Sequence, residues 1–122
     1  ADPLDLSIRR TRVDGRDCLD PAALVRRLDA LAADHEESTV AATAQDGLAR
    51  GLADVAVEAA RDRGVDAVGF TGGVAYNEAI SRSIRERVEG TDLAWLGHDR
   101  LPPGDGGVAI GQITVATARE KT

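Results

Sequence analysis

The sequence VDAVGFTGGVAYN, residues 65–77, decides how this chain folds. Its apolar start ends in Thr71-Gly72-Gly73, and the residues that follow have helical spacing. Glycines let the backbone come close to a ligand, and the free N–H groups at the start of a helix favour an anion. The stretch therefore predicts a strand, a glycine turn suited to phosphate and a helix, although an ordinary tight connection has the same pattern.

A second glycine-rich turn follows at residues 101–107, where Pro-Pro-Gly-Asp-Gly-Gly also precedes a helix-like pattern. Its Asp105 is either the N-cap of that helix or a ligand for a metal held by nucleotide phosphates. Asn77 is open to two similar interpretations, because its side chain can cap a helix or reach a ribose or phosphate oxygen. His98 and Asp99 are either further ligands or solvated loop residues. On the residues alone, the alternatives at both turns stay open.

Composition limits the class of protein. The 122 residues fit one domain, 1–122, and with 43% hydrophobic but only 2% aromatic residues its core is expected to consist of Ala, Val, Leu and Ile. A formal net charge of -6 argues against nucleic acid or an anionic membrane as the main partner. Cys18 is the only cysteine and no apolar run is long enough to span a bilayer. We therefore expect a cytoplasmic protein without disulfides.

Apolar spacing and turn residues predict the order of the elements. They predict a hairpin that turns at Asp14-Gly15, a helix from Pro21 to near Asp34, a helix from Ser38 or Thr39 to Gly64, a central parallel strand over residues 65–70, a helix that stops at Gly90, a strand over residues 93–96 and a helix from Val108. The stripe expected to pack the long helix is Val40, Ala44, Leu48, Leu52, Val55 and Ala59. This order is typical of an α/β fold, with a small mixed sheet, an N-terminal hairpin and helices packed on the sheet. Because a sheet of about four strands is thin, one edge is expected to need a partner.

The chain offers no nucleophile for catalysis. It has no Ser-His-Asp order, no Cys-His cluster and no lysine in a phosphate-binding glycine loop. We therefore expect no catalytic residue in it, and a role in positioning a nucleotide.

The two turns carry a resemblance to a known family. Phe70-Thr71-Gly72-Gly73-Val74, Asn77 and RLPPGDGGVAIGQ at residues 100–112 resemble the C-terminal end of the hydrogenase-maturation carbamoyltransferases of the HypF family. The preceding LDPAAL and VAATAQDGLARGLADVAVEAA are similar to the segment that leads into that end. The resemblance implies an actin-like ATPase (ribonuclease H-like) fold, of which this chain is the C-terminal lobe.

The resemblance also implies a site and a reaction. It places Gly72 and Gly73, with Thr71 beside them, against the adenosine and phosphate of ATP, gives Asn77 a nucleotide contact, and makes Asp105 a ligand of a divalent metal, Mg or Fe. The implied reaction makes a carbamoyl-adenylate from carbamoyl phosphate and ATP and passes the carbamoyl group to a cysteine of HypE. The implied partners are a HypE-like acceptor and the N-terminal lobe and domains of the same protein. Alone, the chain is expected to be inactive and prone to self-association.

Two other interpretations stay open. The chain resembles, less closely, a lobe of the tRNA threonylcarbamoyl-adenosine synthesis proteins, whose loop before the final helix is less like the Pro-Pro pair and whose tRNA partner the negative charge disfavours. It can also be a non-catalytic module that keeps the fold in order to dock a partner.

Overall fold

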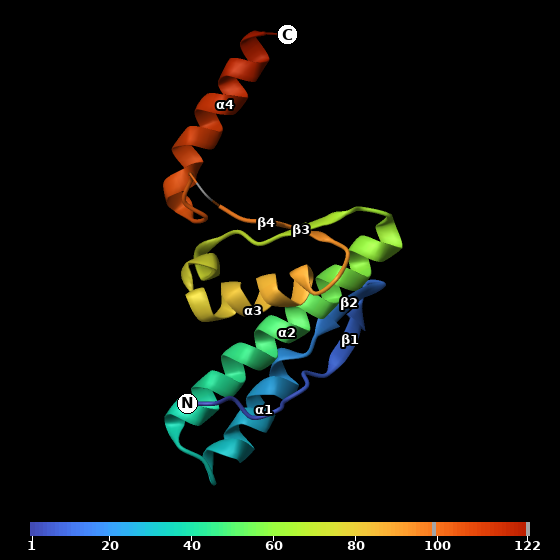
Figure 1. Ribbon diagram of the computed structural model, residues 1–122, viewed down its shortest axis with the longest axis vertical. Helices are drawn as coiled ribbons and strands as arrows, with labels where there is room; N and C mark the ends of the chain where they lie inside the picture. The colour runs from blue at the N-terminus through green and yellow to red at the C-terminus, as the bar shows by residue number, and fades with distance from the viewer. Residues whose placement is uncertain (99, 122) are drawn as a thin grey trace.

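The computed structural model describes residues 1–98 and 100–121 and confirms the α/β class (Figure 1). In chain order its elements are β1 Arg10–Val13, β2 Arg16–Leu19, α1 Pro21–Ala32, α2 Glu37–Arg63, β3 Ala67–Gly69, α3 Glu78–Glu89, β4 Ala94–Leu96 and α4 Val108–Glu120. Two short 3₁₀ turns, η1 Gly73–Tyr76 and η2 Asp105–Gly107, precede α3 and α4. The long helix α2 runs through the body of the molecule and contacts α1, α3, β2 and β3.

The strands form two separate two-stranded sheets rather than the single sheet that was expected. β1 and β2 are antiparallel and turn at Asp14 and Gly15, which both have positive φ as such a two-residue turn requires. β3 and β4 are parallel, as predicted, but β3 is not a central strand. The hairpin packs on α2 instead, where Leu19 of β2 lies so close to Gly51 that a Cβ there would be 3.1 Å from the leucine methyl groups.

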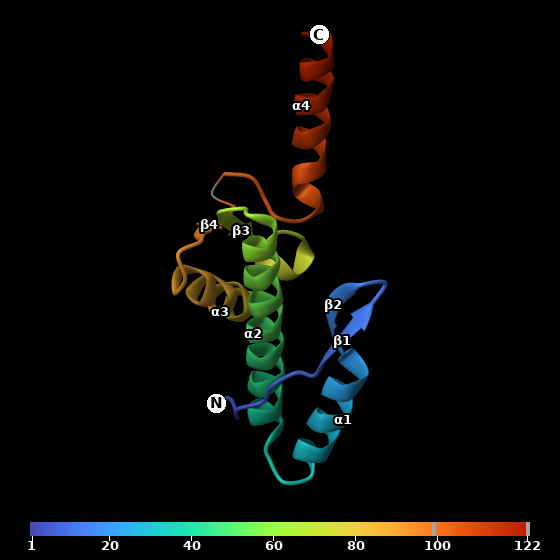
Figure 2. The same ribbon diagram turned by 90° about the vertical axis from the view of Figure 1, so that its right-hand side faces the viewer.

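Residues 1–9 cross α2 in an extended conformation and have no strand partner in the described part of the chain (Figure 2). Leu4, Leu6 and Ile8 alternate with polar residues, a pattern that predicts the first strand of the hairpin, but here it reflects contact with a helix, and that strand lies at Arg10–Val13 instead. Leu6 is buried, and a Cβ on Gly47 of α2 would stand 3.2 Å from the Leu6 carbonyl oxygen. The hydroxyl of buried Thr43 accepts a hydrogen bond from the Leu4 N–H at 2.9 Å. Small and hydroxylated residues of α2 thus hold this segment directly on the helix.

The helix ends follow their capping residues. Asp20 caps α1 as predicted, because its carboxylate accepts a hydrogen bond from an N–H of the first turn at 3.1 Å. α2 begins at Glu37 without a side-chain cap, so the expected caps Ser38 and Thr39 lie inside its first turn instead. The negative charge of Glu37 suits the positive end of the helix dipole there. The helix ends before Gly64, as predicted.

The core lies between α2, α3 and β3. Its buried residues are Ala49, Ala53, Val57, Ala60, Val68, Ile80, Ile84, Val88 and Leu93. The face predicted for α3 is confirmed, but the stripe expected on α2 is wrong, since Leu52 for instance is 40% exposed. The buried positions of α2 are Thr43, Gly47, Ala49, Ala53, Val57 and Ala60. These small side chains allow α3 and the N-terminal segment to approach α2 more closely than leucines would.

The last helix, α4, has the predicted start but projects from the body of the molecule (Figures 1 and 2). All thirteen of its residues are exposed, and residues 108–118, VAIGQITVATA, carry no charge. A helix without a charged face is normally covered on several sides. In the described part of the chain, none of the helices has the length and apolar character needed to cross a bilayer.

Candidate functional site

The glycine turn after β3 and the loop before α4 are in direct contact (Figure 1). The Gly72 N–H donates a hydrogen bond to the carbonyl oxygen of Pro103 at 2.8 Å. The Thr71 hydroxyl donates to the same oxygen at 3.2 Å, and its Oγ1 is 2.7 Å from His98 Nε2. The fold thus joins the two turns that the sequence singled out, and it adds His98 to them.

The two neighbouring glycines play different parts in this contact. Gly72 has φ 102° and ψ -179°, a backbone region that is almost restricted to glycine. Its N–H already donates to the Pro103 carbonyl oxygen in this structure, and the contact of Gly72 with a nucleotide stays a prediction. The Gly73 N–H makes no hydrogen bond with the described residues, and a Cβ there would meet nothing within 4 Å. Gly73 is therefore the glycine that a ligand can approach.

Asn77 caps α3. Its Oδ1 accepts a hydrogen bond from the Ile80 N–H at 3.1 Å, so the capping interpretation is confirmed. The side-chain Nδ2 makes no hydrogen bond with the described residues. The cap fixes the carboxamide at the start of α3 and leaves one donor for a ligand.

Asp105 lies exposed in η2 and does not cap α4. The residue before α4 is Gly107, which provides no side-chain cap, so the capping interpretation of Asp105 is wrong. Among the described residues, no group of three His, Cys, Asp or Glu side chains is placed to hold a metal ion. Asp99 lies outside the described residues, and His98 is bound to the glycine turn. Because a divalent cation takes several oxygen ligands, the described residues do not form a complete metal site, and Asp105 is the residue of the two turns that can offer a carboxylate to one.

A hollow of about 720 Å³ opens beside the glycine turn, between η1, α3 and the end of β4. It is lined by Phe70, Ala75, Tyr76, Glu78, Ser81, Arg82, Arg85, Trp95, Gly97, His98 and Pro103. None of Thr71, Gly72, Gly73, Asn77 or Asp105 lines it, but Tyr76 and Pro103 belong to the same two turns. Its size and its mixture of rings and polar groups suit a small ligand.

The polar residues of α3 in this hollow were missed by the sequence reasoning. Ser81 donates from its Oγ to the Ala75 carbonyl oxygen at 2.8 Å, which ties α3 to η1. Arg82 is exposed and has no ion pair with the described residues. The helical spacing of Ile80 and Ile84 could have identified these residues. Because both isoleucines face the core, the polar residues between them lie on the other side of α3.

Comparison with known proteins identifies the family. Residues 2–112 match the HypF family model described as the carbamoyltransferase Kae1-like domain, second subdomain, a range that includes both glycine-rich turns. The chain belongs to the HypF family. This finding favours HypF over the tRNA-modification relatives and agrees with the resemblance of the two turns.

Similar proteins and solved structures agree with this identification. The chain is 34% identical over 108 residues to the carbamoyltransferase HypF2 of Cupriavidus necator, and 35% identical over 65 residues to the probable carbamoyltransferase HypF of Methanocaldococcus jannaschii. It matches the crystal structure of T. kodakarensis HypF with a TM-score of 0.79, at 32% identity over 93% of this chain. It also has the fold of a full-length HypF solved in its phosphate- and nucleotide-bound form, with a TM-score of 0.83 at 20% identity over 96% of this chain.

The chain is short beside these HypF proteins. It spans 13% of the Cupriavidus protein and 8% of the Methanocaldococcus protein. It covers 14% and 16% of the two solved HypF chains. The family is that of carbamoyltransferases, and most of the length of such an enzyme lies outside the matched segment.

Proposed function

We propose that residues 1–122 form a single domain, the C-terminal lobe of a longer HypF carbamoyltransferase, and that they supply one wall of a cleft for ATP and a divalent metal. The whole protein would make a carbamoyl-adenylate from carbamoyl phosphate and ATP, and then pass the carbamoyl group to a cysteine of a HypE-like acceptor. In this proposal the chain positions the nucleotide and contributes no nucleophile, so the isolated lobe is inactive.

The hydrogen bond from the Gly72 N–H to Pro103 is the observation that carries this proposal. This hydrogen bond holds the two turns together. Gly73 directly follows Gly72, and Asp105 lies two residues after Pro103, so both are close to this bond along the chain. The free N–H of Gly73 can donate to a phosphate oxygen, and Nδ2 of Asn77 can donate to a ribose or phosphate oxygen. The carboxylate of Asp105 can bind Mg or Fe beside the phosphates, where the metal would neutralise their charge.

The hollow beside the turns is the space that we assign to the nucleoside. At about 720 Å³ it is large enough for a small ligand, and the ring of Tyr76 offers a surface on which a base can stack. Arg82 supplies a positive charge without an ion-pair partner among the described residues. Thr71 acts indirectly, since its hydroxyl is bound to His98 and Pro103 and so supports the shape of the turn.

The second wall and the other metal ligands would come from the N-terminal part of the longer protein. Asp105 supplies only one carboxylate, and the chain spans 16% or less of its solved relatives. The uncharged, exposed surface of α4 is where we expect that part to pack. When the lobe is isolated, the same surface is where we expect it to self-associate.

Calorimetric titration of the longer protein with ATP and Mg²⁺ tests the site. Asp105→Asn and Gly73→Ala should each weaken ATP binding about tenfold, because one removes a metal ligand and the other puts a methyl group where the phosphate would approach. Asp34→Asn is the matched control, since this exposed aspartate lies in the turn between α1 and α2, and its ATP affinity should not change. Unaltered affinity in both site variants would exclude the proposed site.

The carbamoyl acceptor is tested separately. The longer protein, carbamoyl phosphate, ATP and a HypE-like protein are incubated, and mass spectrometry follows the carbamoyl group on the acceptor cysteine. Transfer should require ATP and, at an ATP concentration near the Kd of the unaltered protein, should be several times slower in Asp105→Asn. An unchanged rate of transfer in this variant, despite its weaker ATP binding, would contradict the role given to the lobe.

A further inference from the structure

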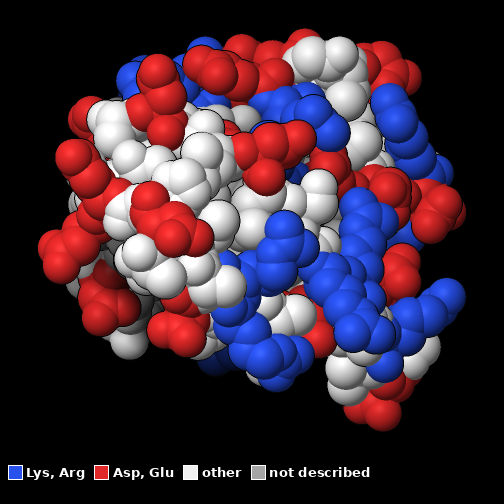
Figure 3. Space-filling model, turned by 90° about the horizontal axis from the view of Figure 1, so that it is seen from below, with Lys and Arg blue, Asp and Glu red and all other residues white. Residues whose placement is uncertain are grey.

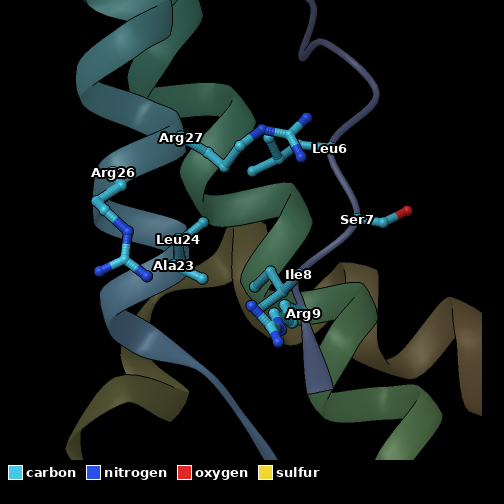
Figure 4. A pocket seen from close by; sticks show the side chains of 8 residues that line it. All are labelled: Leu6, Ser7, Ile8, Arg9, Ala23, Leu24, Arg26 and Arg27. Atoms are coloured by element: carbon cyan, nitrogen blue, oxygen red, sulfur yellow. The ribbon is translucent and has the colours of Figure 1, made fainter. Parts of the chain in front are cut away.

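A second hollow lies at the end of the molecule opposite α4, between residues 1–9 and α1 (Figures 1 and 4). Its volume is about 320 Å³, and it is lined by Leu6, Ser7, Ile8, Arg9, Ala23, Leu24, Arg26 and Arg27. The side chains of Leu6, Ile8 and Leu24 make it apolar inside, while three arginines surround it. We call it the arginine groove.

The arginines of this groove have no ion pairs with the described residues. By contrast, carboxylates pair with Arg10, Arg12, Arg50, Arg61, Arg85 and Arg87. Figure 4 shows Arg27 reaching from α1 towards Leu6 and Arg9 lying beside Ile8, with Arg26 on the outer side of α1. Seen from this end of the molecule, basic side chains run through the centre and right of the view, while acidic ones cover the left and also lie among the basic ones (Figure 3). Three arginines without an ion pair among the described residues, Arg9, Arg26 and Arg27, thus line one groove in a chain whose net charge is -6.

The backbone beside the groove is also unpaired. The Leu4 N–H donates to Thr43, and the Arg9 carbonyl oxygen accepts from the Asp20 N–H at 2.8 Å. Between these two anchors, the N–H and carbonyl groups of residues 6–8 make no hydrogen bonds with the described residues. The Leu6 carbonyl oxygen lies against Gly47 of α2, so the exposed Ser7 is the residue of this segment whose N–H and carbonyl groups another extended peptide can reach.

We propose that the arginine groove binds an extended acidic segment of a separate partner protein. An apolar side chain of that segment would fill the hollow against Ile8 and Leu24, and flanking carboxylates would pair with Arg9 and Arg27. Backbone hydrogen bonds to Ser7 would fix its direction. Arginine suits such contacts because its planar guanidinium binds a carboxylate through two hydrogen bonds.

Charge and shape favour this occupant over others. A free phosphate would satisfy the arginines but leave the apolar lining exposed to water. Nucleic acid is a poorer fit, because the groove has no aromatic side chain on which a base can stack. We expect the rest of the longer protein to pack on α4 rather than on this groove, because the exposed surface of α4, at the opposite end of the molecule, is uncharged.

Fluorescence anisotropy with the peptide acetyl-Glu-Asp-Leu-Glu-Asp-amide, labelled and added to the longer protein at low salt, tests the proposal. Arg9→Gln and Arg27→Gln should each weaken binding about tenfold, since each removes a charge-assisted hydrogen bond. Arg63→Gln is the matched control, because Arg63 is exposed, has no ion pair with the described residues and lies outside the groove. Circular dichroism of each variant confirms that it is folded.

Peptide variants separate the proposal from its competitors. Replacing the acidic residues by Gln and Asn, or the leucine by Ser, should each weaken binding at least fivefold. The proposal is overturned if the peptide does not bind, if the leucine makes no difference, or if inorganic phosphate at equal concentration displaces the peptide. It is equally overturned if the three protein variants bind alike, or if sedimentation shows that Arg9→Gln and Arg27→Gln only separate copies of the protein from one another.

Discussion

Gly72 and Gly73 are neighbours with opposite structural requirements. Gly72 needs its unusual backbone angles to bring its N–H to Pro103, whereas the fold of this chain places no constraint on Gly73. A glycine that the fold does not require is available for a role in binding. Gly72 is therefore needed for the stability of the turn, whereas Gly73 leaves room for the approach of a ligand.

Substituting alanine at these two positions should therefore change the free energy of unfolding by different amounts. Gly72→Ala should lower the free energy of unfolding by about 1–3 kcal/mol, because alanine is strained at φ 102°. Gly73→Ala should change it by less than about 0.5 kcal/mol, since its Cβ would point into open space. Urea denaturation of both variants measures the difference. Equal losses of stability would show that the positive φ of Gly72 is not what the turn depends on.

Thr43 provides a second test at the residue scale. Its buried hydroxyl donates to the Thr39 carbonyl oxygen at 2.7 Å and accepts from the Leu4 N–H. Thr43→Val keeps the shape but leaves that N–H unpaired, and it should cost about 1–2 kcal/mol. Thr43→Ser, the control, keeps the hydroxyl and should cost less. If valine proves as stable as threonine, the hydroxyl does not anchor the N-terminal segment.

At the scale of elements, α3 and α4 contrast most clearly. Both begin after a glycine-rich turn and a 3₁₀ turn, and both starts follow from the sequence. α3 has a buried face and a side-chain cap from Asn77, whereas α4 has neither within the described chain. Since a helix of thirteen residues is marginal without packing, α4 is the weaker of the two in this lobe.

Substituting one isoleucine on each helix tests this difference in packing between α3 and α4. Ile84 is 4% exposed and Ile113 is 67% exposed. Ile84→Ala should lower the stability of the isolated chain by about 2–5 kcal/mol through the cavity that it leaves, while Ile113→Ala should stay within about 0.5 kcal/mol. Thermal unfolding of both variants checks the expectation. A large loss in Ile113→Ala, at a concentration where the chain is monomeric, would mean that α4 folds back onto the lobe.

At the scale of the whole molecule, the hydrophobic core is confined to one part of the chain. It joins α2, α3, β3 and the start of β4, while the hairpin and α1 are held on α2 by Leu6, by Leu19 against Gly51 and by ion pairs such as Arg10 with Glu58. The carboxylate of Glu58 raises the pKa of Arg10 above its ordinary value, so this pair stays charged wherever the carboxylate is ionised. Exposed pairs of this kind contribute little stability.

Hydrogen exchange should follow this division. Amides in α3 and in the C-terminal half of α2 should exchange most slowly, those of α1 and the hairpin faster, and those of α4 fastest, because regions with few buried contacts open at lower free energy. Hydrogen–deuterium exchange followed by mass spectrometry measures the exchange rates of these segments. Slow exchange throughout α1 and the hairpin, equal to that of α3, would indicate a single cooperative unit instead.

Local chemistry made much of this fold predictable. Asp20, Asn77 and the glycines after α2 and α3 set helix ends through contacts with their own neighbours in the chain, and the spacing of Ile80 and Ile84 identified the buried face of α3. The predicted N-cap of α2 was two or three residues too late, and its predicted buried stripe was wrong as well. The smallest side chains are buried there because two partners from distant parts of the chain approach the helix closely.

The sequence by itself determined the order of the elements, most of their ends and the two glycine-rich turns that mark the HypF family. Only the tertiary structure decided that the strands form two sheets, that Pro103 joins the two turns and binds the Gly72 N–H, and that Asp105 belongs to no group of three metal-ligating side chains among the described residues. The same holds for the arginine groove, whose two sides come from the N-terminal segment and α1. Caps and spacing act between near neighbours and can be recognised in the sequence. Contacts between distant segments depend on how closely two backbones approach, which local preferences do not specify.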